Sequence, residues 1–170
     1  MRPLPLTLAA AAVSVAVLAA EDGGFDVQLK LAFPSATSFS AKEGNPPHYK
    51  AFVQEGGKPR LAGYAYQTID LEPLERGYEG PIRYLVGMDL KGVLQGVVLL
   101  GHNEPYGNFS IDLPGFPAQF KGKSIRDTFR VGVDVDHVSR ATISITSSAR
   151  AIKNSSRRMA RAYLTPDAVK

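Results

Sequence analysis

The chain has 170 residues, a net charge of +4 at pH 7 and no cysteine. A chain of this length fits one domain better than two. The lack of cysteine excludes disulfides, thiolate metal sites, iron–sulfur clusters and cysteine nucleophiles. Its three histidines lie far apart in the sequence and have no zinc-like spacing, which argues against a dedicated metal site.

The first 20 residues have the pattern of an export signal. Arg2 supplies the positive charge, residues 4–18 are apolar and rich in alanine, and Val17-Leu18-Ala19 is a small-residue cleavage site. An uncleaved N-terminal anchor is the alternative, because signals and anchors overlap in length. We therefore expect residues 1–20 to be a signal peptide or anchor. The remaining chain is expected to be exported to the periplasm, and to be membrane-associated if the N-terminus is retained.

Short apolar segments follow, separated by glycine and proline. Pro34 and Pro46-Pro47 interrupt any regular element near the start of the mature chain. The apolar residues of segment 93–101 suggest burial on both faces, so we expect this segment to be a central strand of a sheet. The segments with the length and composition of strands are 49–53, 61–68, 82–88 and 93–101.

The second half of the chain is first rich in loops and then helical. Residues 101–120 contain the glycines and prolines of a surface loop, and Phe129–Val135 alternates as a further short strand would. From Ile145 to Tyr163, apolar and small residues recur at steps of three and four, which predicts a long amphipathic helix that ends before Pro166. Strands followed by one long helix predict an α+β domain, with the helix packed on a small antiparallel sheet.

The other side of this helix pattern is basic. A basic helix face is most often simply solvated, although it can bind an anionic surface. Export disfavours nucleic acid as that partner. The cationic residues are Arg150, Lys153, Arg157, Arg158 and Arg161.

Residues 136–142, Asp-His-Val-Ser-Arg-Ala-Thr, stand directly before the helix and carry the most specific chemistry. They place Thr142 at the helix start, where unpaired N–H groups and the helix dipole favour a phosphate. Ser139 can cap the helix or bind the phosphate, and Asp136 can orient the turn. The alternative is that Ser139 and Thr142 are ordinary helix-capping residues.

Two further segments have the composition of site loops. Gly77-Tyr78-Glu79-Gly80-Pro81 can form a tight turn that leaves the Tyr78 ring free. His102-Asn103-Glu104-Pro105 places a histidine and a carboxylate just beyond a strand end. The alternatives are an ordinary loop with a half-buried Tyr78, a Glu104 that caps a loop, and a partly buried His102 whose polar atoms are satisfied.

With Phe33-Pro34-Ser35-Ala36, these segments occur in the order seen in a known family. From Phe33 to Tyr163 the sequence resembles the FMN-binding domain of exported electron-transfer flavoproteins. It resembles most the periplasmic N-terminal domain of NosR-type membrane flavoproteins. The FMN-carrying subunits of the sodium-pumping NADH:quinone oxidoreductase and of the Rnf complex are more distant. The resemblance implies that residues 21–170 are an FMN-binding domain serving electron transfer, rather than a stand-alone enzyme that converts a substrate.

The resemblance also implies site residues and partners. A separate flavin transferase, using FAD and a divalent metal, would leave FMN bonded through its phosphate to Thr142. A membrane or periplasmic redox partner would exchange electrons with the domain, and no nucleic acid is involved. The other residues implied to contact the cofactor are Tyr78, Gly80, His102, Glu104, Pro105, Asp136, Ser139, Arg140 and Ala141.

Arg140 departs from the family pattern D-x-x-[ST]-G-A-[ST], in which this position is glycine. Glycine allows a positive φ angle that arginine disfavours. Either the turn is not left-handed here or modification is less efficient, while an arginine beside a phosphate can also act as a bidentate partner. A phosphoester at Thr142 and non-covalent FMN are therefore both open. The alternative function is a flavin-free or flavin-sensing interaction or maturation module that docks to a membrane redox partner.

Overall fold

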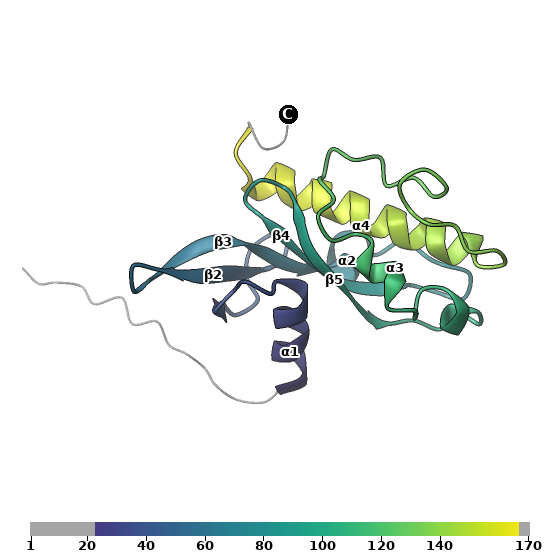
Figure 1. The fold of residues 1–170 in the computed structure, drawn as a ribbon, viewed down its shortest axis with the longest axis horizontal. Coiled ribbons are helices and arrows are strands. Elements are labelled where there is room, and N and C mark those ends of the chain that lie inside the picture. Colours follow the sequence, from purple (N-terminus) through teal and green to yellow (C-terminus); the bar gives the residue numbers. More distant parts are fainter. Residues whose placement is uncertain (1–22, 167–170) are drawn as a thin grey trace, which may run out of the picture.

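The computed structural model describes residues 23–166, which form three layers (Figure 1). One face of a central sheet carries α1 (Gly23–Ala32), and the other carries α4 (Thr142–Tyr163). The expected α+β architecture is confirmed. The sheet is antiparallel, with its strands in sequence order: β1 (Ser38–Phe39), β2 (Tyr49–Glu55), β3 (Lys58–Gln67), β4 (Arg83–Asp89) and β5 (Leu94–Gly101). The short helices are α2 (Thr68–Leu71), a 3₁₀ helix (Gly107–Phe109) and α3 (Gly115–Ala118).

The predicted export signal, residues 1–20, lies outside the described residues. Within residues 23–166, no helix is both long enough and apolar enough to cross a membrane.

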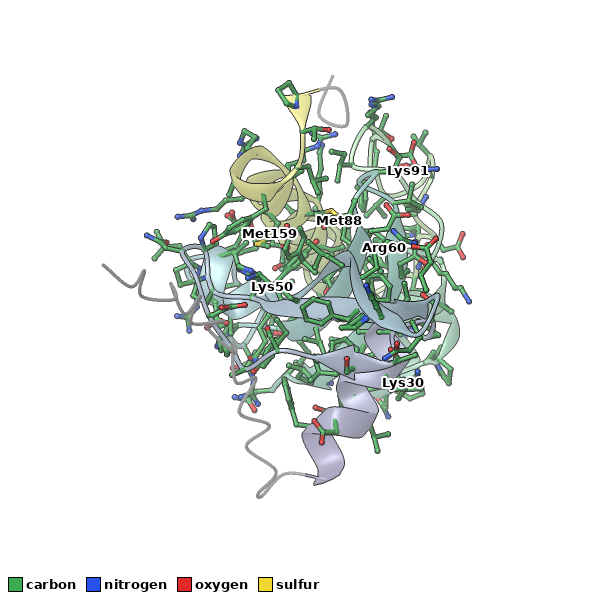
Figure 2. All side chains as sticks on the ribbon, turned by 90° about the vertical axis from the view of Figure 1, so that its left-hand side faces the viewer. Lys30, Lys50, Arg60, Met88, Lys91 and Met159 are labelled. Carbon is green, nitrogen blue, oxygen red and sulfur yellow. The ribbon has the colours of Figure 1, made fainter. Side chains whose placement is uncertain are left out.

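The long helix packs against the sheet through a mixed apolar and hydroxyl interface. Figure 2 shows Met88 of β4 and Met159 of α4 in this layer, and both are fully buried. The Tyr84 hydroxyl of β4 donates to Ser148 Oγ of α4 at 2.9 Å. Because such buried polar pairs are costly to separate, they resist sliding of α4 along the sheet. They therefore help to position Thr142 at the start of the helix.

The expected central position of segment 93–101 is wrong, because β5 is an edge strand that pairs with β4. A following loop covers its outer edge: the Leu94 N–H donates to the Lys123 carbonyl, and the Gly122 N–H donates to the Leu94 carbonyl, both at 2.8 Å. On the α1 side, a Cβ added at Gly96 would lie 2.7 Å from the Leu31 carbonyl oxygen. The apolar character of β5 thus reflects cover by a loop and a helix rather than by a further strand.

The strand expected at Phe129–Val135 is also absent from the described fold, which has a loop there. The Asp134 carboxylate accepts hydrogen bonds from the Thr128 hydroxyl and from the backbone N–H groups of Phe129 and Arg130. Burial would raise the pKa of Asp134, but these bonds and the nearby Lys123 lower it to about 2. Side-chain bonds to the backbone compete with strand pairing, which explains the difference.

The sequence pattern also missed α1. Its ten residues begin with Gly23-Gly24, which weaken a helix, and Pro34 follows its end closely. The helix is stabilised by packing: Leu29 and Ala32 are buried against Ala65 and Leu85, on the face of the sheet opposite α4.

Candidate functional site

A pocket of about 340 Å³ lies at the N-terminal end of α4. Three segments far apart in the sequence form it: the loop after α2, the loop after β5 and the first turn of α4. Its volume is within the range of small-molecule sites. The lining residues are Tyr78, Pro105, Tyr106, Arg140, Ala141, Thr142, Ile143 and Ser144.

Three large side chains at this pocket are unusually exposed. Tyr78 is 64% exposed, Tyr106 53% and Ile143 57%. Aromatic and branched apolar side chains gain free energy when they leave water, so their clustering at a pocket favours a ligand with a flat apolar part.

The start of α4 offers a place for an anion. Ala141 precedes the first helical residue, and within the described chain no side chain caps this end of the helix. The N–H groups of Thr142, Ile143 and Ser144 therefore have no partner from the preceding turn. Ser139 lies two residues before this N-cap position, so of its two suggested roles capping is not the one that the helix start shows. Unpaired N–H groups and the helix dipole make this pocket wall suited to a phosphate.

Arg140 has φ +71°, so the turn before α4 is left-handed even though the residue is not glycine. The alternative that the turn is not left-handed is therefore wrong. A non-glycine residue in this conformation costs about 1–3 kcal/mol. The Arg140 side chain lines the pocket beside Thr142, where a guanidinium can bind phosphate oxygens through two bonds.

We expect Arg140→Gly to make the protein more stable but to weaken its hold on an anion. Glycine relieves the strain at φ +71°, which should raise the free energy of unfolding by about 1 kcal/mol. Urea denaturation measures this change. Arg140→Ala is the matched control, because it removes the charge but keeps the Cβ and thus the strain. An equal stability gain in both variants would contradict the explanation by strain.

Glu104 joins two of the three pocket segments to α4. It is 6% exposed, and its carboxylate accepts hydrogen bonds from the backbone N–H groups of Tyr78 and Glu79, both at 2.9 Å, and from the Ser144 hydroxyl. Burial raises the pKa of this carboxyl, but the hydrogen bonds from Ser144 and from the backbone of residues 78–80 outweigh it, so the pKa lies below its usual value. Glu104 is thus ionised and holds the pocket wall from behind.

Glycine is needed at position 77 because of this carboxylate. A Cβ added at Gly77 would lie 2.5 Å from Glu104 Oε1. The Gly77 N–H donates to the Gly80 carbonyl at 2.7 Å, which closes the turn that presents Tyr78. Gly80 contributes through its backbone, since a Cβ there would meet only open space and the tip of Arg76.

His102 does not reach the pocket lining. Its Nδ1 accepts the Glu104 N–H at 2.8 Å, so its Nε2 carries the proton of the neutral ring and donates to Asp112 Oδ1 at 2.6 Å. Both ring nitrogens are occupied, and the histidine orders the loop that carries Glu104 and Pro105.

The sequence reasoning missed a contact at Thr142. The exposed Thr142 hydroxyl lies 3.1 Å from His137 Nε2. When that nitrogen is unprotonated, it can accept the hydroxyl proton. His137 occupies a position of the family pattern at which any residue is allowed. The sequence therefore did not indicate that it would contact Thr142.

Of the ten residues expected at the site, five line one pocket: Tyr78, Pro105, Arg140, Ala141 and Thr142. Glu104 and Gly80 lie directly behind its wall. Ser139 and Asp136 are exposed in the turn before α4 and do not line it, and the Asp136 N–H donates to Gln119 Oε1 at 2.7 Å. Residues that line the pocket without having been expected are Tyr106, Ile143 and Ser144.

Comparison with protein families gives a match to the FMN-binding domain over residues 77–157. The match contains the whole pocket and three of the four segments that carried the resemblance, whereas Phe33–Ala36 lies outside it. FMN is therefore the cofactor that this domain indicates. No curated protein matches the chain significantly.

Proposed function

We propose that this FMN-binding domain is an exported electron carrier whose FMN is bonded through its phosphate to Thr142. The observation that carries the proposal is the exposed Thr142 hydroxyl at the uncapped start of α4, inside a pocket with aromatic walls. As in the NosR-type proteins that the sequence resembles, the domain would serve a membrane or periplasmic redox partner.

The residues present fit FMN. The N–H groups of the first turn of α4 and the Arg140 guanidinium suit the phosphate, and Tyr78 and Tyr106 suit the flat ring system. When bound, FMN supplies transfer of one or two electrons. The domain's own residues orient the cofactor and set its electrostatic surroundings, to which the buried negative charge of Glu104 contributes.

Attachment to Thr142 needs FAD and a flavin transferase as the modifying partner. Thr142 Oγ1 forms a bond to the phosphorus on the flavin side of FAD, the pyrophosphate bond breaks, and AMP leaves. The proton of the Thr142 hydroxyl passes to His137 Nε2, which lies 3.1 Å away. His137 therefore positions the hydroxyl and takes its proton.

The test is to produce the full-length protein together with a flavin transferase, denature it in detergent and examine the gel band for flavin fluorescence. A fluorescent band whose mass has increased by one FMN moiety is expected. A dark band with FMN still bound in native protein would overturn covalent attachment but keep the flavoprotein function. Absence of flavin from native protein would favour a flavin-free interaction module instead.

We expect His137→Ala to slow attachment of FMN without preventing it. An acid–base group typically contributes 10²–10⁴-fold, and because His137 is exposed we expect a smaller effect, about tenfold. The initial rate of band fluorescence with purified transferase and FAD measures it. Added imidazole should restore much of the rate to His137→Ala. A rate that imidazole leaves unchanged would show that His137 is only structural.

A further inference from the structure

A second hollow, of about 460 Å³, runs along α4 beyond the pocket. We call it the basic groove. More than half of its lining residues are cationic, and among the described residues that line it none is acidic. The cations are Arg126, Arg130, Arg150, Lys153 and Arg157, and the other lining residues are Thr128, Phe129, Val131 and Thr146.

Carboxylates compensate the positive charges of four of these cations, Arg130, Arg150, Lys153 and Arg157, only weakly. Arg150 Nε is 3.4 Å from a Glu75 carboxylate oxygen, and the Arg150 side chain remains 56% exposed. Arg157 donates to two backbone carbonyl groups, at 2.8 and 2.9 Å, which carry no charge. Within residues 23–166, no carboxylate forms an ion pair with Lys153 or Arg130. The groove therefore has a positive potential that attracts anions.

One wall of the groove is held in a strained conformation. Phe129 is 5% exposed and has φ +51°, which is rare for a residue with a side chain. Its N–H donates to the Asp134 carboxylate at 2.9 Å, and its ring stacks on Phe120 with 6.0 Å between centroids. Such strain persists only where the surroundings enforce it, and it is concentrated at binding sites. The surroundings thus fix the backbone of this wall of the groove.

The groove begins one helical turn after Thr142. Residues 142, 146, 150, 153 and 157 are spaced by three or four, so they share one face of α4. The eleven steps from Thr146 to Arg157 span about 16 Å at 1.5 Å per residue. That length suits about five residues of an extended peptide. A partner bound there would lie directly beside the proposed flavin attachment residue.

We propose that the basic groove is the docking surface for an extended acidic segment of a partner protein. Carboxylates of that segment meet the cationic side chains, and its apolar side chains meet the partly buried Val131. A bilayer fits less well, because an extended peptide can enter a concave groove and planar headgroups cannot. The apolar face of α4 is moreover buried against the sheet, with Ile145 and Ile152 fully buried, and cannot insert. The proposal does not require that Thr142 carries FMN.

The test measures fluorescence anisotropy of a labelled short peptide in which glutamate and leucine alternate, added to the full-length protein. We expect binding that weakens as salt rises, and no binding of the same peptide with glutamine in place of glutamate. In Arg150→Glu/Lys153→Glu the affinity should fall by about tenfold or more. Lys58→Glu/Lys91→Glu is the matched control, since it changes the net charge by the same amount at two exposed lysines, one at the start of β3 and one in the turn between β4 and β5.

Circular dichroism verifies that both double variants are folded. Equal loss of affinity in the two would overturn the proposal, because it would reflect net charge alone. Failure of the wild-type protein to bind the peptide would also overturn it. Binding to phosphatidylserine vesicles, lost in Arg150→Glu/Lys153→Glu without any peptide binding, would assign the groove to a membrane surface instead.

Discussion

Thr142→Ala is expected to abolish the fluorescent band of denatured protein completely. The physical reason is that, among its described residues, the pocket offers no other accessible aliphatic hydroxyl to replace that of Thr142. Apart from Thr142, the one aliphatic hydroxyl among the described lining residues belongs to Ser144, which is 5% exposed and donates to Glu104. That hydroxyl faces away from solvent and holds the pocket wall, so it cannot reach a phosphorus atom carried by another protein.

Two further variants make this test specific. Thr142→Ser keeps the hydroxyl and should keep the band, although the missing methyl group lets the side chain rotate more freely and should slow the reaction. Thr146→Ala removes the hydroxyl one turn further along α4 and should leave the band unchanged. A band that survives in Thr142→Ala would assign the attachment to another residue. Native Thr142→Ala protein that still binds FMN would show that the pocket works without the bond.

The long helix could be predicted because its signal is local. The repeat from Ile145 to Met159 corresponds to the buried face of the helix. The motif of residues 136–142 places Thr142 at the start of this helix, and neither signal depends on how the sheet is arranged. The position of β5 could not be predicted in this way. Its apolar residues indicate burial but not whether a strand, a loop or a helix provides the cover.

The sequence predicted which segments form the site but not how their side chains are arranged. Glu104 meets Tyr78 and Ser144, which are 26 and 40 residues away, so its role depends on how three separate segments pack. Because of that packing, Glu104 supports the pocket wall from behind. Likewise, the sequence does not show that Arg140 takes up the left-handed conformation that the family pattern reserves for glycine, and the fold does.

This packing implies that the pocket depends on one buried charge. Glu104 receives two backbone N–H bonds and a hydroxyl bond, and it is the link between the loop of residues 77–80 and α4. The rest of this pocket wall is made of loops. The ionised Glu104 carboxylate therefore fixes the backbone at Tyr78, which determines where the Tyr78 ring can lie. Removing the charge of Glu104 should therefore both disorder the pocket wall and lower the stability of the fold.

We expect Glu104→Gln to lower the free energy of unfolding by about 2 kcal/mol at neutral pH, since an amide presents an N–H group to one of the backbone donors. It should also weaken non-covalent FMN binding about tenfold. Urea denaturation and flavin titration measure the two effects. Glu79→Gln is the matched control: it removes an exposed carboxylate from the same loop and should change neither quantity. Equal effects of the two variants would show that the charge of the loop, rather than the Glu104 bonds, is responsible.

The pH dependence of this difference has a definite sign. Because hydrogen bonds lower the pKa of Glu104 in the folded protein, the unfolded chain takes up a proton first as the pH falls below the usual glutamate value of 4.5. The stabilisation by Glu104 is therefore fully present above pH 4.5 and is lost as the pH falls through the lower value of the folded state. Wild type and Glu104→Gln should converge in stability over this acidic range. A difference that stays constant would mean that Glu104 acts through its shape and not through its charge.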